Sequence, residues 1–146
     1  MKLTVKIRKL HPGAVLPRRS TASAAGADLC ALLEEPLTVY PGETVFVHTG
    51  LSCEIPEGYG GFVFARSGLA SKQGLAPANK VGVIDSDYRG EIMVALHNHA
   101  PLPVNVENGQ RIAQLVIMPV AMAEYVEEEA LSETERGAGG FGSTGK

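Results

Sequence analysis

Short runs of β-branched and aromatic residues, separated by glycine- and proline-rich turns, dominate this sequence. Four such runs are ETVFVHTGLSCEI, GGFVFARS, GEIMVALHNH and RIAQLVIMPV, with turns such as YPGE and IPEGYGG beside them. Near the N-terminus, LTVKIRKL alternates apolar with polar residues, which is the period of a strand with one buried face. Many short strands at close spacing predict an all-β fold, either a barrel or a sandwich.

The remaining segments complete the domain organisation. SGLASKQG (67–74) predicts one short helix, with Ser67 as its N-cap and Gly74 at its end. The last eleven residues, RGAGGFGSTGK, contain five glycines and can bury too little apolar surface to order themselves. We therefore expect one domain, with residues 1–135 forming the β-barrel and residues 136–146 forming a flexible C-terminal arm.

Charge and hydropathy exclude several classes of function. The net charge is −3 and the basic residues cluster only in PRRS (17–20), so we expect no nucleic-acid partner. Apolar runs fall short of the roughly 20 residues that span a bilayer. The N-terminus alternates in polarity and lacks the continuous apolar block of a signal peptide. These patterns predict a cytoplasmic protein with no membrane partner.

The stretch GVIDSDYRGE (82–91) is the strongest candidate for chemistry. It holds three acids within a β-rich neighbourhood, and the runs on either side of DSDYRG predict a β-hairpin. Asp85 directly follows Val83 and Ile84, which would place its carboxylate at the rim of a pocket, where it could take a proton from water. Tyr88 offers a flat ring close by. The alternative is an ordinary polar turn.

Three further patterns in the sequence also have simpler explanations. Arg66 and Ser67 lie at a predicted strand-to-helix junction, which suits an anion but also suits an ordinary cap. His97 and His99 share the outward face of a strand, and two ligands are too few for a typical zinc site. The tail matches G-x-G-x-x-G, but a dinucleotide-binding turn needs a helix after it and the chain ends at Lys146.

Five segments, in order, resemble the five motifs of the homotrimeric dUTPases, the deoxyuridine triphosphate nucleotidohydrolases. They are AGADLCA (25–31), ARSGLA (65–70), NKVGVIDSDYRGE (79–91), GQRIAQLVI (109–117) and RGAGGFGSTG (136–145). Ala65 stands where the family often has proline, and Gln110 stands where an acid is usual. The resemblance implies a distorted jelly-roll β-barrel, a homotrimer with active sites shared between subunits, and a C-terminal arm that closes over the site.

The resemblance also implies a reaction and roles for the third motif. dUTP and water would give dUMP and pyrophosphate, with Mg²⁺ as cofactor, which keeps uracil out of DNA and supplies dUMP for thymidylate synthesis. Asp85 would activate the water that attacks the α-phosphorus. Tyr88 would lie against the deoxyribose. Asn79 and the backbone near Met93 would bind the uracil edge, and Gly82 would allow close approach.

The other motifs would hold the phosphates and close the site. Arg66, Ser67, Gly68 and Gln114 would bind the phosphates, and Asp28 would orient waters around Mg²⁺. In the arm, Phe141 would stack on the uracil ring. The arm residues expected to clasp the phosphates are Arg136, Gly142, Ser143 and Thr144.

Two other functions are compatible with this scaffold. A relative of the dCTP deaminases would use a carboxylate to activate water against the cytosine ring, but DSDY and the complete glycine-rich tail argue against it. A regulatory nucleotide-binding protein would bind dUTP with little turnover. The sequence retains the residues needed for catalysis, which favours an enzyme.

Overall fold

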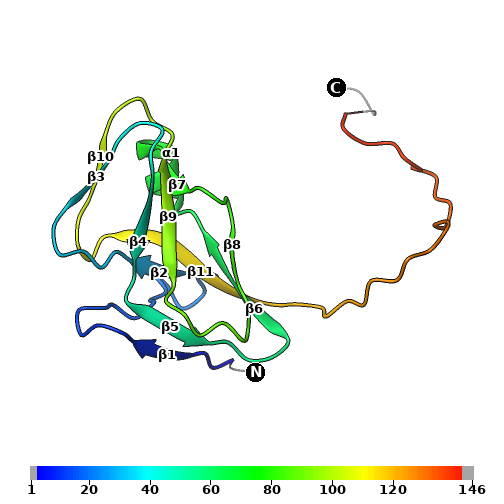
Figure 1. Cartoon of the computed structure of the whole chain (residues 1–146), viewed down its shortest axis with the longest axis horizontal. Coiled ribbons are helices and arrows are strands. Elements are labelled where there is room, and N and C mark those ends of the chain that lie inside the picture. Colours follow the sequence, from blue (N-terminus) through cyan, green and yellow to red (C-terminus); the bar gives the residue numbers. More distant parts are fainter. Residues whose placement is uncertain (1–2, 143–146) are drawn as a thin grey trace.

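The chain folds almost entirely into short strands (Figure 1). The structure is a computed structural model and describes residues 3–142. The elements are β1 (Lys6–Lys9), β2 (Ala27–Cys30), β3 (Leu37–Val39), β4 (Thr44–His48), β5 (Leu51–Glu54), β6 (Tyr59–Phe64), α1 (Ser67–Gln73), β7 (Leu75–Pro77), β8 (Gly82–Ile84), β9 (Met93–Asn98), β10 (Val104–Val106) and β11 (Arg111–Pro119). The predicted all-β fold with a single short helix is confirmed for the described residues.

The strands pair antiparallel in four groups. The largest sheet has the order β2-β11-β6-β8, and a second has the order β4-β9-β7. Two ribbons, β1-β5 and β3-β10, complete the structure. Within residues 3–142 the strand pairing does not run continuously around the molecule. The distorted jelly-roll therefore forms an open barrel around its core.

One apolar core lies between these sheets. The side chains of Leu29, Val47, Leu96 and Ile112 are fully buried and come from β2, β4, β9 and β11. Asn98 is a buried polar residue in the same core, and its amide nitrogen donates to the carbonyls of Val39 at 2.9 Å and Leu102 at 2.8 Å. Because its hydrogen bonds are made, this amide is accommodated without an unsatisfied polar group.

The helix begins one residue earlier than predicted. Arg66, with extended backbone at φ −85° and ψ 128°, occupies the N-cap position, and it makes no side-chain capping bond. Ser67 is the first helical residue, so its assignment as N-cap was wrong. Gly74 ends the helix as predicted, in the left-handed conformation at φ 69°. An added Cβ there would lie 2.8 Å from the backbone nitrogen of Ala100, so glycine is required.

The predicted β-hairpin around DSDYRG is also wrong. β8 pairs with β6, whereas β9 pairs with β4 and β7, so the two strands belong to different sheets. The loop between them (85–92) therefore crosses from one sheet to the other. At its end the Ile92 N–H donates to the Leu51 carbonyl at 2.7 Å, which binds the loop to the start of β5 and keeps it from folding back on β8.

Beyond Pro119 the described chain has no helix or strand. Residues 120–142 extend away from the barrel, coloured orange to red in Figure 1. Ser143 and Thr144 lie outside the described residues. In the described part of the chain, no helix is long and apolar enough to cross a membrane.

Candidate functional site

A pocket of about 250 Å³ opens where the loop 85–92 crosses between the two sheets. It is lined by Asn79, Gly82, Asp85 and Tyr88 of the third motif and by Met93, which was predicted beside them. The crossing loop and strands β8 and β9 supply most of this lining. The structure therefore brings together side chains that are spread over fifteen positions of sequence.

Asp85 lies at the rim of this pocket. Ile84 before it is buried in the core, whereas Asp85 itself is exposed at the end of β8. Its carbonyl accepts the Tyr88 N–H at 3.1 Å, which closes a tight turn. The rim position predicted from the sequence is therefore observed.

Tyr88 folds back along the loop towards β9. Its Oη donates to the Glu91 carbonyl at 2.9 Å. A Cβ on Gly90 would lie 2.3 Å from the Tyr88 Oη, so only glycine at position 90 leaves room for the tyrosine ring. The ring thus has a defined direction beside Asp85, with 43% of the residue still exposed.

Gly82 lines the pocket and has no side chain to fill it. Its position in β8 pairs with Val63 of β6. An added Cβ would approach both Asn79 Nδ2 and Val63 Cβ to 3.3 Å. The absence of a Cβ at Gly82 therefore leaves space beside the Asn79 amide.

A second group of predicted residues forms around Asp28. In register across the sheet, Asp28 of β2 lies opposite Gln114 of β11, which lies opposite Phe64 of β6. The Arg66 Nε donates to Asp28 Oδ1 at 2.8 Å, and the Gln114 amide donates to the Ala65 carbonyl at 2.9 Å. The first, second and fourth motifs therefore meet in one place.

This second group faces a basic hollow of about 420 Å³. Arg66, Gly68, Lys72 and Arg111 contribute to its lining. Arg111 also donates to Asp28 Oδ2 at 3.3 Å. Three cationic side chains thus outnumber the Asp28 carboxylate, which gives a local positive charge although the whole chain is at −3. An anion with several charges would be attracted here.

The two groups lie apart on one chain. Ile84, just before Asp85, pairs with Gly61 near the start of β6, whereas Arg66 follows the end of β6. The extended chain from Gly61 to Arg66 spans about 16 Å at the usual rise of ~3.3 Å per residue. Asp85 and Arg66 are therefore at opposite ends of the same strand.

The arm carries the last predicted group. The Arg136 Nε donates to the Gly139 carbonyl at 2.8 Å, and the Phe141 side chain is fully exposed. Gly142 adopts φ 87°, a conformation that favours glycine. Figure 1 shows this part of the arm well away from the barrel. Within one chain, the arm therefore meets neither of the two groups.

Two residues near the pocket were not predicted as site residues. Phe46 lines it from β4 and is 69% exposed, and Glu91 lines it from the crossing loop. Phe46 lies in the predicted strand run ETVFVHTGLSCEI, but its approach to β9 depends on sheet pairing. Glu91 was visible as a third acid of the motif, with no sign of what it contacts.

The described residues offer few direct ligands for a metal ion. Among residues 3–142, no three His, Cys, Asp or Glu side chains gather closely enough to hold a metal ion. His97 and His99 lie on the outward face as predicted, with ring centroids 4.4 Å apart. Asp28 suits an indirect role for Mg²⁺, because its carboxylate is largely buried but can accept further hydrogen bonds from water.

Comparison with known proteins decides the family. A sequence model of the dUTPase family matches residues 13–145. The chain belongs to the dUTPase family. The family predicted from the five motifs is thereby confirmed, as is its class of enzyme, the hydrolysis of dUTP.

Relatives and solved structures agree with this dUTPase assignment. The deoxyuridine 5'-triphosphate nucleotidohydrolase of Desulfitobacterium hafniense (strain DSM 10664 / DCB-2) is 58% identical over 89% of this chain and 87% of that protein. The protein of the same name from Anaeromyxobacter sp. (strain Fw109-5) is 52% identical over the full length of both. The dUTPase of Staphylococcus bacteriophage 80alpha with dUPNHPP has a TM-score of 0.89 at 30% identity, covering 98% of this chain and 99% of that chain.

A further dUTPase structure bears on the metal. The enzyme from phage phi11 of S. aureus has a TM-score of 0.80 at 26% identity, over 89% of this chain and 99% of that one. That structure is described as revealing the coordination of a structural Mg(II) ion.

Proposed function

We propose that this chain hydrolyses dUTP to dUMP and pyrophosphate, with Asp85 as general base. One observation carries the proposal: the predicted nucleoside residues line a single pocket, with Asp85 at its rim and Tyr88 directed across it. The basic hollow beside Asp28 supplies the complementary site for phosphates. The product dUMP would feed thymidylate synthesis, and removal of dUTP would keep uracil out of DNA.

The Asp85 carboxylate would accept a proton from a water molecule placed before the α-phosphorus. The water oxygen forms the new P–O bond, and the bond from the α-phosphorus to the bridging oxygen breaks, so that pyrophosphate leaves. Positioning in line with the leaving group contributes as much as basicity. General base catalysis of this kind contributes roughly 10²–10⁴-fold to the rate.

The pocket would select the nucleoside. Asn79 and the backbone beside Met93 would bind the uracil edge, while Gly82 leaves space for the ring. Cytosine presents a donor where uracil presents an acceptor, and such a mismatch can discriminate by ~10⁴ when it leaves buried polar groups unpaired. Tyr88 would lie against the sugar and leave no space for a 2'-hydroxyl.

Arg66, Ser67, Gly68 and Gln114 would bind the phosphates, and of these Arg66 and Gly68 line the basic hollow. Mg²⁺ would neutralise part of the negative charge of the phosphates. It would keep several of its water ligands, as Mg²⁺ usually does in proteins. Asp28 would accept hydrogen bonds from those waters. Its pairs with Arg66 and Arg111 already fix the direction of its carboxylate.

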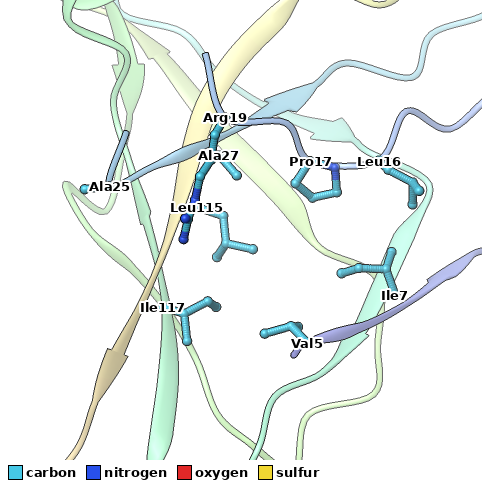
Figure 2. A pocket seen from close by; sticks show the side chains of 9 residues that line it. All are labelled: Val5, Ile7, Leu16, Pro17, Arg19, Ala25, Ala27, Leu115 and Ile117. Atoms are coloured by element: carbon cyan, nitrogen blue, oxygen red, sulfur yellow. The ribbon is translucent and has the colours of Figure 1, made fainter. Parts of the chain in front are cut away.

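The active site would be shared within a homotrimer. Separation of Asp85 from Arg66 along β6 supports this, because a nucleotide would need both. An apolar hollow of about 250 Å³ beside β1 and β11 also supports it (Figure 2). Val5, Ile7, Leu115 and Ile117 point into this hollow, and a neighbouring subunit would shield such a surface from water.

The arm would close over the bound nucleotide. Phe141 would stack on the uracil ring, and Arg136, Gly142, Ser143 and Thr144 would bind the phosphates. A fully exposed phenylalanine at the end of an extended segment supports this role, because burial on a ring would be favourable. Ordering of the glycine-rich segment costs entropy, so closure should need a triphosphate.

Pyrophosphate release from dUTP, dCTP, dTTP and UTP tests the proposal. We expect release from dUTP alone. Ammonia release from dCTP would instead indicate a deaminase, and tight dUTP binding without pyrophosphate would indicate a regulatory binding protein. The cytoplasmic location expected from the N-terminal sequence remains a prediction.

A further inference from the structure

We propose that Glu91 is a positioning residue for sugar selection, because its carboxylate clamps the Tyr88 loop to the turn between β4 and β5. The inference rests on the proposed contact of Tyr88 with the deoxyribose. Glu91 itself would not touch the reacting atoms. It would act by fixing the place of the ring that excludes a 2'-hydroxyl.

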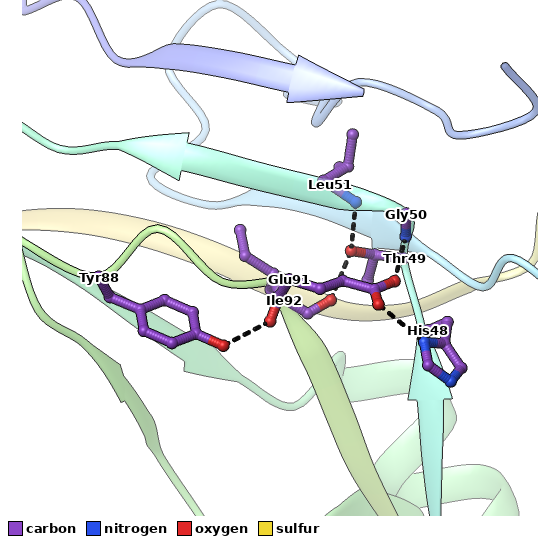
Figure 3. Close-up of polar contacts among 7 residues, drawn as sticks. All are labelled: His48, Thr49, Gly50, Leu51, Tyr88, Glu91 and Ile92. Atoms are coloured by element: carbon purple, nitrogen blue, oxygen red, sulfur yellow. Dashed lines mark hydrogen bonds and ion pairs between the residues drawn. The ribbon is translucent and has the colours of Figure 1, made fainter. Parts of the chain in front are cut away.

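The Glu91 carboxylate has two partners on the turn (Figure 3). Oε1 accepts the Gly50 N–H at 2.8 Å, and Oε2 lies 2.8 Å from the Nδ1 of His48. The Glu91 side chain is 23% exposed and that of His48 is 57% exposed. The Gly50 bond is therefore the more sheltered of the two, and the histidine closes the outer side.

The turn that receives this carboxylate is closely packed. Gly50 adopts φ 66°, and a Cβ there would lie 2.6 Å from Leu32 Cδ2, so the turn requires glycine at this position. Thr49 is fully buried, and its hydroxyl donates to the Ile92 carbonyl at 2.5 Å. The Ile92 N–H in turn donates to the Leu51 carbonyl at 2.7 Å. Residues 91 and 92 are thus bound from both sides to 49–51.

Glu91 also binds Tyr88, through its backbone carbonyl. Figure 3 shows the Tyr88 hydroxyl directed at the Glu91 carbonyl while the Glu91 carboxylate points away to His48 and Gly50. Tyr88 and Glu91 both line the nucleoside pocket. The clamp therefore connects a buried turn, through one residue, to the ring that meets the sugar.

The direction of the Glu91 pKa shift indicates that its carboxylate is ionised. Burial alone would raise the pKa of Glu91, but hydrogen bonds from His48 and Gly50, together with the charge of His48, outweigh it and lower the pKa. The carboxylate is therefore ionised at neutral pH, and its hydrogen bonds are of the stronger, charge-assisted kind.

Steady-state kinetics of the full chain with dUTP and UTP tests the clamp. The readout is the ratio of kcat/KM for dUTP to kcat/KM for UTP. We expect Glu91→Ala to lower this ratio about ten-fold, because a misplaced ring selects poorly. Glu91→Gln should largely restore it, since its amide oxygen can accept from Gly50 and its NH₂ can donate to His48.

Glu43 offers the matched control. Its Oε2 accepts the Tyr40 N–H at 2.9 Å in a turn before β4, so it makes a similar carboxylate-to-backbone bond away from the pocket. Glu43→Ala should leave the ratio unchanged. If Glu91→Ala does not fold, Glu91→Asp keeps the charge and shortens the reach, and the same fall is expected.

The variants separate this inference from the proposed function. Tyr88→Leu should lower the ratio by at least as much as Glu91→Ala. If Tyr88→Leu lowers it and folded Glu91→Ala does not, the clamp is overturned while the Tyr88 contact stands. If neither variant lowers it, the sugar contact and the clamp are both overturned. A fall for Glu91→Gln as large as for Glu91→Ala would also overturn the hydrogen-bonded clamp.

Discussion

The Arg66 guanidinium is held in place by Asp28 before any ligand arrives. Its Nε donates to Asp28 Oδ1 at 2.8 Å, and the two side chains are only 25% and 15% exposed. This contact joins residues 38 positions apart, one from the first motif and one from the second. Orientation of the arginine in advance lowers the entropy lost when it binds a phosphate.

Substitution of Asp28 should therefore affect both metal and phosphate. Asp28→Asn would retain one oxygen as acceptor but lose the charge that holds two guanidinium groups. We expect a higher KM for dUTP and a higher Mg²⁺ concentration for half-maximal rate. Pyrophosphate release in an Mg²⁺ titration measures both, and an unchanged Mg²⁺ dependence would remove Asp28 from its proposed role.

Substitution of Asp85 should separate chemistry from binding. Asp85→Asn should slow pyrophosphate release by about 10²–10⁴-fold, because the amide cannot accept the proton of water. Calorimetry with a non-hydrolysable dUTP analogue should show nearly unchanged binding. Asp87→Asn is the matched control, since Asp87 lies in the same loop but does not line the nucleoside pocket. Hydrolysis by Asp85→Asn at a near-normal rate is the contrary outcome.

The arm should contribute more to triphosphate binding than to monophosphate binding. Phe141→Ala should weaken binding of a dUTP analogue by roughly 1–3 kcal/mol, the range of base–aromatic stacking. The loss of binding free energy should be smaller for dUMP, because closure of the arm over the nucleotide depends on the γ-phosphate. Tyr125→Ala is the control, at a 95% exposed residue of the segment that leads from Pro119 to the arm. Equal losses for both nucleotides would contradict coupled closure.

The Glu91 clamp should make stability depend on acid pH. Because hydrogen bonding lowers the folded-state pKa of Glu91, its contribution is present above the unfolded value of about 4.3 and is lost as pH falls through the folded pKa. The difference in Tm between the wild-type chain and Glu91→Gln should therefore persist from neutral pH to about pH 5 and shrink below pH ~4. A difference that stays constant from pH 7 to pH 3 would argue against an ionised clamp.

Most features that depend on local sequence were predictable, the assignment of Ser67 as N-cap being an exception, and those that depend on pairing were not. Asp85 was placed at a pocket rim because it follows two apolar strand residues, and Gly74 was placed at a helix end because glycine adopts a positive φ. The hairpin prediction failed because β8 and β9 each found a different partner strand. Propensity alone carries no information on that choice.

The clamp was invisible in the sequence for the same reason. Glu91 reaches His48 and Gly50 across 43 and 41 positions, and no local pattern marks such a contact. Likewise, the spacing of the motifs does not reveal that Asp85 and Arg66 lie at opposite ends of β6. Both findings needed the register of the sheets.

Subunit mixing tests the sharing of the active site most directly. Asp85→Asn and Arg66→Ala chains should each be nearly inactive alone. If one site takes Asp85 from one copy and Arg66 from another, co-refolding the two variants should restore pyrophosphate release, since some sites would then contain both native residues. Mixed assemblies that stay as inactive as either variant alone would show that both residues act from the same chain, and would contradict the shared site.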